Sequence, residues 1–174
     1  MVIAIAQMDY EHVDDVVEVQ KLSYREDLHE EGDIYVEKLK FYPKGSVVAL
    51  HENRVVGYIV TFPWDDTVPQ LNSTGLSMPE KITRYWLNDM AIAPTHRGQG
   101  VSKLILSKVA QIVREESVDV VSLVCISPES EKFWQKIGFS STFHEPLAEE
   151  TLAKYGDFVR HMGMLASTFC ERFQ

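Results

Sequence analysis

NDMAIAPTHRGQGVSKLIL, the stretch from Asn88 to Leu106, decides the fold. In it an apolar strand runs into Pro94, a basic glycine-rich turn follows, and an amphipathic helix comes after the turn. The first amides of a helix have no internal partner, and the helix dipole favours an anion there. Gly98 and Gly100 lack Cβ atoms, which lets the backbone turn sharply and approach a pyrophosphate closely. The stretch therefore predicts a phosphate-binding turn between a strand and a helix.

The spacing inside this turn separates it from two other phosphate-binding motifs. It is not a P-loop, because no Gly-Lys-Ser/Thr follows the required spacer, and it is not a G-x-G-x-x-G dinucleotide fingerprint. It reads R-x-x-G-x-S, with Arg97, Gly100 and Ser102 at the fixed positions. This resembles the R/Q-x-x-G-x-G/A signature of the GNAT superfamily of N-acetyltransferases, which hold the pyrophosphate of acetyl-CoA there. The alternative is an ordinary strand-to-helix turn.

Length and composition predict a single domain, residues 1–174, with a substantial core. The net charge of −9 disfavours nucleic acid as a partner and is compatible with a cationic amine substrate. The alternative is that the acidic surface only keeps the protein soluble. No apolar run reaches the roughly 20 residues that span a bilayer, so no membrane association is expected. Cys125 and Cys170 are too few for a disulfide framework, which favours a cytoplasmic location. No metal-ligand spacing occurs, so we expect no metal.

The hydrophobic pattern predicts the element order β-α-α-β-β-β-α-β-α-β-β. Strands are expected at Val2–Ala6, Ser46–His51, Val55–Phe62, Arg84–Ala93, Val118–Ile126 and Phe158–Ala166, and helices at Tyr10–Tyr24, Asp33–Phe41, Gly98–Ser117 and Pro128–Lys136. The irregular stretch Pro63–Thr83 is expected to be an insertion loop. The order indicates an α/β (α+β) fold, with a mixed central sheet of about six to seven strands and helices on both faces. The GNAT fold has the same element order.

Two further segments carry the resemblance. The hairpin strand VVGYIV, Val55–Val60, is common in the superfamily. SPESEKFWQKIGF, Ser127–Phe139, is similar to N-x-x-A-x-x-x-Y/F-Y-x-K-x-G-F and agrees with it at the final Lys, Gly and Phe. Ser127 replaces an Asn that often contacts the cofactor, although a hydroxyl can still bond a pantetheine amide. Trp134 replaces a Tyr that protonates the departing thiolate in many members. An indole N–H cannot act as a general acid, so we expect Trp134 to pack.

The resemblance implies direct transfer from acetyl-CoA, in which an amine attacks the thioester with no covalent enzyme intermediate. The backbone of residues 90–92 would pair with the pantetheine arm, and one of its amides could polarise the thioester carbonyl. The amides from Arg97 to Ser102 would hold the pyrophosphate. The expected cofactor site comprises Met90, Ala91, Ile92, Arg97, Gly98, Gln99, Gly100, Val101, Ser102, Ser127 and Trp134.

An attacking amine must be neutral, so a base is expected. Regular alternation places Trp86, Asn88 and Met90 on one face of their strand and Leu87, Asp89 and Ala91 on the other. Asp89 is the one strand acid near the expected thioester, and it is either the base, an amine-binding group or a structural carboxylate. Further candidates on loops are His144, Glu145, Tyr155, Asp65 and Asp66, whereas His96 is expected at the surface.

These observations favour an enzyme, an N-acetyltransferase acting on a small-molecule or a peptide or protein amine, and allow a homodimer. A non-catalytic acyl-CoA-binding or sensor module is the alternative, because the residues at positions 127 and 134 depart from the pattern. A third possibility is another nucleotide-binding protein that shares only the glycine-rich turn. The resemblance implies that the acceptor pocket is built from the early helices and variable loops, here roughly Tyr24–Phe41 and Pro63–Thr83.

Overall fold

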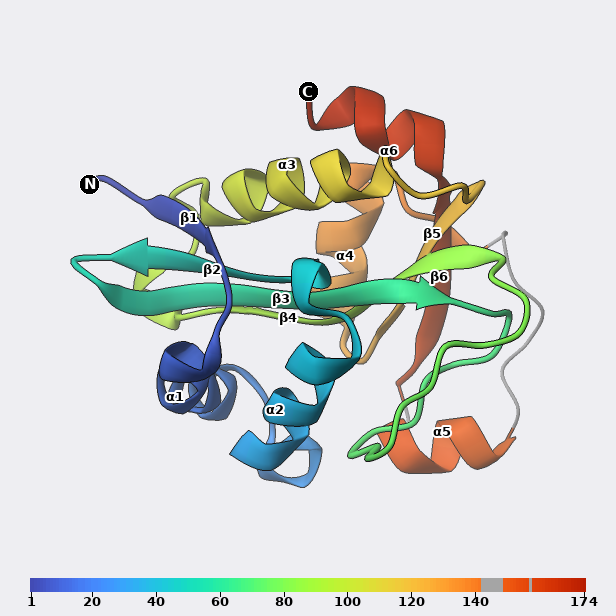
Figure 1. Ribbon diagram of the computed structural model, residues 1–174, viewed down its shortest axis with the longest axis horizontal. Coiled ribbons are helices and arrows are strands. Elements are labelled where there is room, and N and C mark those ends of the chain that lie inside the picture. Colours follow the sequence, from blue (N-terminus) through green and yellow to red (C-terminus); the bar gives the residue numbers. More distant parts are fainter. Residues whose placement is uncertain (142–148, 157) are drawn as a thin grey trace.

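A six-stranded mixed sheet with helices on both faces forms the centre of the computed structural model, which describes residues 1–141, 149–156 and 158–174 (Figure 1). The strands lie in sequence order: β1 (Ala4–Gln7), β2 (Ser46–His51), β3 (Arg54–Trp64), β4 (Arg84–Ile92), β5 (Val120–Cys125) and β6 (Arg160–Leu165). Among the described strands only β4 and β5 run parallel, and every other neighbouring pair is antiparallel. This architecture confirms the predicted fold class.

The helices divide the core into two layers, one on each face of the sheet. Helices α1 (Val13–Ser23) and α2 (Gly32–Phe41) cover one face. Helices α3 (Val101–Val113), α4 (Pro128–Ile137) and α6 (Ala166–Arg172) cover the other. The remaining elements are α5 (Glu149–Tyr155) and the short 3₁₀ turns η1 (Tyr10–His12), η2 (Glu26–Leu28), η3 (Pro43–Gly45) and η4 (Pro94–His96). No described helix is both long enough and apolar enough to cross a membrane.

The helix after the glycine-rich turn is shorter than predicted. It begins at Val101 rather than Gly98, because Gly98 and Gly100 adopt φ values of +73° and +83°, which a right-handed helix does not allow. Leu104, in the first turn of this helix, is 43% exposed. The helix nevertheless buries Ile105, Val109 and its other apolar positions against the sheet.

The C-terminal part of the chain differs from the predicted order. The sequence pattern placed two strands after α4, whereas the described residues there form α5, β6 and α6. An isolated antiparallel bridge joins Ser140 to Gly163, a residue of β6. The apolar residues of α6, Ala166 and Phe169, are buried against the α3 side of the core, so tertiary packing determines a helix that local pattern did not reveal.

A β-bulge in β4 changes which side chains share a face. Val60 of β3 lies opposite Asp89, but the next residue, Thr61, lies opposite Leu87, so Asn88 is an extra residue in β4. Beyond the bulge, Met90 packs on the same side as Leu87. The predicted alternation across Asn88 is therefore wrong, because an inserted residue shifts the period of two by one position.

Strand β4 also separates from its parallel neighbour, β5. Pairing between β4 and β5 ends at Leu87 and Leu123, although β4 continues to Ile92 and β5 continues to Cys125. The two strands diverge beyond this point, and an opening through the sheet results. The bulge lies at the start of this opening.

Candidate active site

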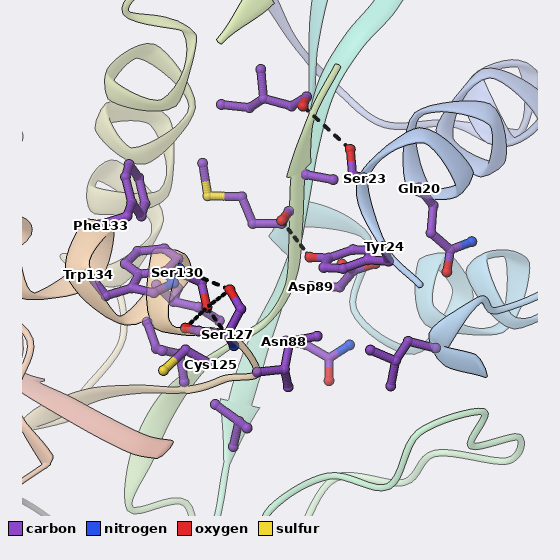
Figure 2. Close-up of a pocket in the computed structure, with 18 of the residues that line it drawn as sticks. Gln20, Ser23, Tyr24, Asn88, Asp89, Cys125, Ser127, Ser130, Phe133 and Trp134 are labelled. Carbon is purple, nitrogen blue, oxygen red and sulfur yellow. Dashed lines mark hydrogen bonds between the residues drawn. The ribbon is translucent and has the colours of Figure 1, made fainter. Parts of the chain in front are cut away.

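A cavity of about 570 Å³ lies where β4 and β5 part. Figure 2 shows Phe133 and Trp134 on one side of β4 and Tyr24 and Asp89 on the other. The predicted residues that line it are Asp89, Met90, Ala91, Ile92, Arg97, Gly98, Ser102, Ser127 and Trp134. Gln99, Gly100 and Val101 are not among the lining residues. The cavity thus connects the glycine-rich turn to the α1 side of the sheet.

The glycine-rich turn leaves open space in front of its backbone. A Cβ added to Gly98 or Gly100 would meet no atom within 4 Å. Gly100 is the N-cap of α3 and offers no side chain to the first helical amides. Anions bind at such uncapped helix starts, so the turn fits a pyrophosphate. Val101 is 1% exposed and the Gln99 amide donates to the Thr95 carbonyl, so these two residues would contribute backbone groups alone.

Hydroxyl groups from the end of α1 reach the diverging edge of β4. The Tyr24 hydroxyl donates to the Met90 carbonyl at 2.6 Å, and the Ser23 hydroxyl donates to the Ile92 carbonyl at 3.4 Å (Figure 2). The Arg97 Nε–H also donates to the Ile92 carbonyl, at 2.9 Å. The edge of β4 at positions 90 and 92 therefore faces the cavity and its polar lining.

Asp89 lies at the α1 end of the cavity, among phenol groups. The hydroxyls of Tyr35 and Tyr58 donate to its Oδ2 atom at 2.7 and 2.8 Å, and they lie 3.0 Å from each other. Burial raises the pKa of Asp89, the Lys38 charge offsets part of this rise, and the Glu30 charge adds to it. Burial and the nearby Asp89 charge also raise the pKa of Tyr24 well above its usual value, so this phenol stays protonated. Among the described residues, no cation forms an ion pair with Asp89.

A second carboxylate near the same end is fully paired. Glu30 and Lys38 form a buried ion pair, with side chains 4% and 3% exposed. Gln20 bonds both backbone groups of Glu30, accepting from its N–H at 2.6 Å and donating to its carbonyl at 2.8 Å. The Asn72 N–H donates to the other Glu30 oxygen at 2.8 Å. This pair fixes the segment after η2 and attaches the 65–83 loop to it.

The opposite wall of the cavity consists of aromatic side chains and the capped start of α4. Trp134 is 8% exposed and meets the rings of Phe133 and Phe139 edge-on, at 4.9 and 5.2 Å between centroids. This position agrees with a packing role. Ser127 forms a reciprocal capping box with Ser130 at the start of α4, so its hydroxyl is engaged locally.

Cys125 also lines the cavity, but its thiol is unsuited to nucleophilic attack. Burial raises its pKa to about 11, so the thiolate is scarce at neutral pH. Its sulfur contacts the Met162 sulfur at 3.6 Å.

The other candidate residues from the sequence lie at different places relative to the cavity. Tyr155 lines the cavity, and burial raises its pKa to about 12. Asp65 bonds Thr67, and Asp66 pairs with Arg84, and neither aspartate lines the cavity. His96 approaches His51, with ring nitrogens 3.1 Å apart. His144 and Glu145 lie outside the described residues. No group of three or more metal-ligating side chains occurs in the described parts of the chain.

Sequence reasoning missed the hydroxyl groups around Asp89. Tyr24, Tyr35 and Tyr58 come from the end of α1, from α2 and from β3, and they meet only in the folded chain. Tyr35 and Lys38, three residues apart on α2, place polar groups on a buried helix face. That spacing was the one local signal for this cluster.

Comparisons with known proteins identify the family and the fold of this chain. Residues 13–139 match the family model described as the acetyltransferase (GNAT) family. Ard1 from Thermoplasma volcanium superposes with a TM-score of 0.74 at 17% identity, covering 95% of this chain and 98% of the other. The loading GNATL domain of CurA from Lyngbya majuscula gives 0.71 at 19% identity, with coverage of 96% and 99%. The PaiA N-acetyltransferase from Thermoplasma acidophilum, solved with coenzyme A, gives 0.69 at 13% identity, with coverage of 95% and 99%.

No curated protein matches the chain. The family model spans well over half of the chain, and the overall fold matches that of the solved structures. The chain belongs to the GNAT family of acetyltransferases.

Proposed function

We propose that this protein is an acetyl-CoA-dependent N-acetyltransferase that moves the acetyl group to a primary amine by direct attack in a ternary complex. The observation that carries the proposal is the cavity between β4 and β5, which joins the open glycine-rich turn to Asp89. Family membership and the coenzyme A bound by the structurally similar PaiA support the choice of cofactor.

The cofactor side of the cavity supplies backbone groups and a helix start. The amides from Arg97 to Ser102 would hold the pyrophosphate, because the uncapped start of α3 favours an anion. The edge of β4 at Met90–Ile92 would align the pantetheine arm, and Trp134 would pack beside it. Acetyl-CoA supplies the acetyl group as an activated thioester.

On the acceptor side, Asp89 would take a proton from the incoming ammonium. The neutral amine then attacks the thioester carbonyl, the C–N bond forms, the C–S bond breaks, and the second proton of the nitrogen passes through water to the departing thiolate. The raised pKa of Asp89 makes it a stronger base than an exposed aspartate. The phenols of Tyr35 and Tyr58 orient its carboxylate.

The leaving thiolate requires no strong acid. A thiol has a pKa of about 8.5, so a thiolate leaves far more readily than an amine. Water can therefore supply the proton to the thiolate where Trp134 cannot. A route through an acetylated Cys125 is disfavoured by the raised pKa of that thiol.

The test is isothermal titration with acetyl-CoA, with CoA and ATP as controls, followed by an assay of thiol release with primary amines. We expect micromolar binding that is selective for the CoA compounds, and amine-dependent release of CoA. Selective binding with no release for any amine would favour the acyl-CoA sensor, an alternative supported by the locally engaged Ser127 hydroxyl. Preference for ATP would overturn the cofactor assignment.

A further inference from the structure

We propose that the acceptor is a small cationic amine rather than the N-terminus of a peptide, bound by Asp89 inside a closed ring of contacts. This inference rests on the proposed function and narrows its substrate class. Three segments surround the acceptor end: the connection between α1 and α2, the 65–83 loop, and the end of α5. Each is joined to the other two.

Two contacts join α5 to the other segments. The Tyr155 hydroxyl donates to the Pro69 carbonyl at 3.1 Å, which joins α5 to the 65–83 loop. The Arg25 guanidinium lies over Gly156, where a Cβ would stand 3.1 Å from Nη2. Glycine at position 156, with a φ of +91°, therefore allows the arginine to approach α5 closely.

A third contact completes the ring. The Asn72 N–H donates to the buried carboxylate of Glu30, which joins the 65–83 loop to the α1–α2 connection. Pro69 and Asn72 thus anchor a four-residue stretch at both ends, and Gln70 and Leu71 between them line the cavity. We call these three contacts the acceptor ring.

The acceptor ring limits the width of the acceptor end. A peptide acceptor continues as an extended chain of about 3.3 Å per residue, with side chains on both faces, so it needs an open groove. Widening this end requires breaking the hydrogen bond of Tyr155 or of the buried Glu30, or moving Arg25 away from Gly156. A slim alkyl ammonium needs no such change.

The charge and polarity of the side chains inside the acceptor ring indicate which kind of ligand binds there. Lys38 pairs with Glu30 and Arg25 pairs with Asp27, so these two cations are neutralised and Asp89 carries the uncompensated negative charge. A partly buried carboxylate without a cation is costly, and a bound ammonium offsets that cost. Leu28 and Leu71 provide apolar walls for a short alkyl chain.

The first experiment measures acceptor choice in the intact protein. Thiol release from acetyl-CoA is followed with butylamine and with a seven-residue peptide that has a free N-terminus. We expect kcat/KM for butylamine to exceed that for the peptide by about 100-fold or more, within the range that a shaped site achieves. Equal or better use of the peptide would overturn the inference and leave the acetyltransferase proposal standing.

Binding separates this inference from the transfer reaction. Butylamine is titrated into the CoA complex, with butanol as the neutral control, and we expect only the ammonium to bind, and Asp89→Asn to abolish its binding. Binding without thiol release would support the small-amine site while transfer fails. Absence of butylamine binding would overturn the inference.

A pair of variants tests whether the ring is the cause. Arg25→Ala combined with Tyr155→Phe removes two of its contacts, and Tyr10→Phe is the control at an exposed tyrosine outside the cavity. We expect the double variant to reduce the preference for butylamine over the peptide by about 10-fold, as expected for a relaxed pocket, and the control to leave it unchanged. An unchanged preference in a folded double variant would refute the role of the ring.

Discussion

In the proposed mechanism, the phenols around Asp89 set the pH at which its carboxylate would act as a base. Tyr58 is fully buried and donates to Asp89 Oδ2 at 2.8 Å. This bond stabilises the ionised form and lowers the pKa, so Tyr58→Phe must raise the pKa of Asp89. A hydrogen bond to a charged group contributes about 1.5–3 kcal/mol, and about 1.4 kcal/mol corresponds to one pKa unit. Because Tyr35 still donates to the same oxygen, we expect a rise of about one unit, at the low end of this range.

The assay is kcat/KM for butylamine against pH, from about pH 5 to about pH 9, with acetyl-CoA saturating. The acidic limb of the profile should lie above the ordinary aspartate pKa of about 3.9, and Tyr58→Phe should move it upward by about one unit. Asp89→Asn should abolish that limb and reduce kcat/KM by about 10²–10⁴-fold, the usual contribution of a general base.

Tyr85→Phe is the matched control. Tyr85 is another fully buried tyrosine, and its hydroxyl bonds Thr61 at 2.8 Å rather than Asp89. Its removal should leave the acidic limb in place. If Tyr58→Phe and Tyr85→Phe give the same limb as the unaltered protein, the titrating group is not Asp89 and the proposed base is wrong.

Three further substitutions test the cofactor site and the buried ion pair. Gly100→Val should abolish acetyl-CoA binding by titration, whereas Gly75→Val, at the same kind of left-handed glycine with equally open surroundings, should retain it; equal affinities would refute the turn as the pyrophosphate site. Trp134→Phe should keep most of its turnover in steady-state assays, because the indole has no proton to donate; a near-total loss with normal acetyl-CoA binding would contradict the packing role. Lys38→Met should lower the free energy of unfolding in urea by about 3–5 kcal/mol, because it leaves a buried carboxylate unpaired; exposed Lys40→Met should change stability little, and similar losses in both would argue against the ion pair.

The parts of the fold that depend on local sequence were predictable. Pro94, Gly98 and Gly100 mark the end of β4 and the turn before α3 through backbone constraints that need no distant partner. The strand Ser46–His51 has the bounds expected from its apolar run. The start of α3 was placed three residues too early, because the periodicity of side chains does not report the φ of a glycine.

The parts that depend on distant contacts were not predictable. The bulge at Asn88 exists only in the register with β3, where Thr61 lies opposite Leu87. The environment of Asp89 depends likewise on Tyr35 and Tyr58, whose hydroxyls come from distant elements. The sequence therefore indicated the acid but not the groups that set its pKa.

In the proposed reaction, the bulge accounts for how one strand would serve two substrates on opposite faces of the sheet. With regular alternation, Asp89 would share a face with Leu87, which packs in the α3–α4 layer. The extra residue instead turns Asp89 toward Tyr35 and Tyr58 in the α1–α2 layer, opposite Trp134. Because β4 and β5 also part just beyond the bulge, an acetyl group held on the α4 side can meet an amine held by Asp89 through the sheet. A single inserted residue thus places the proposed base on the acceptor side.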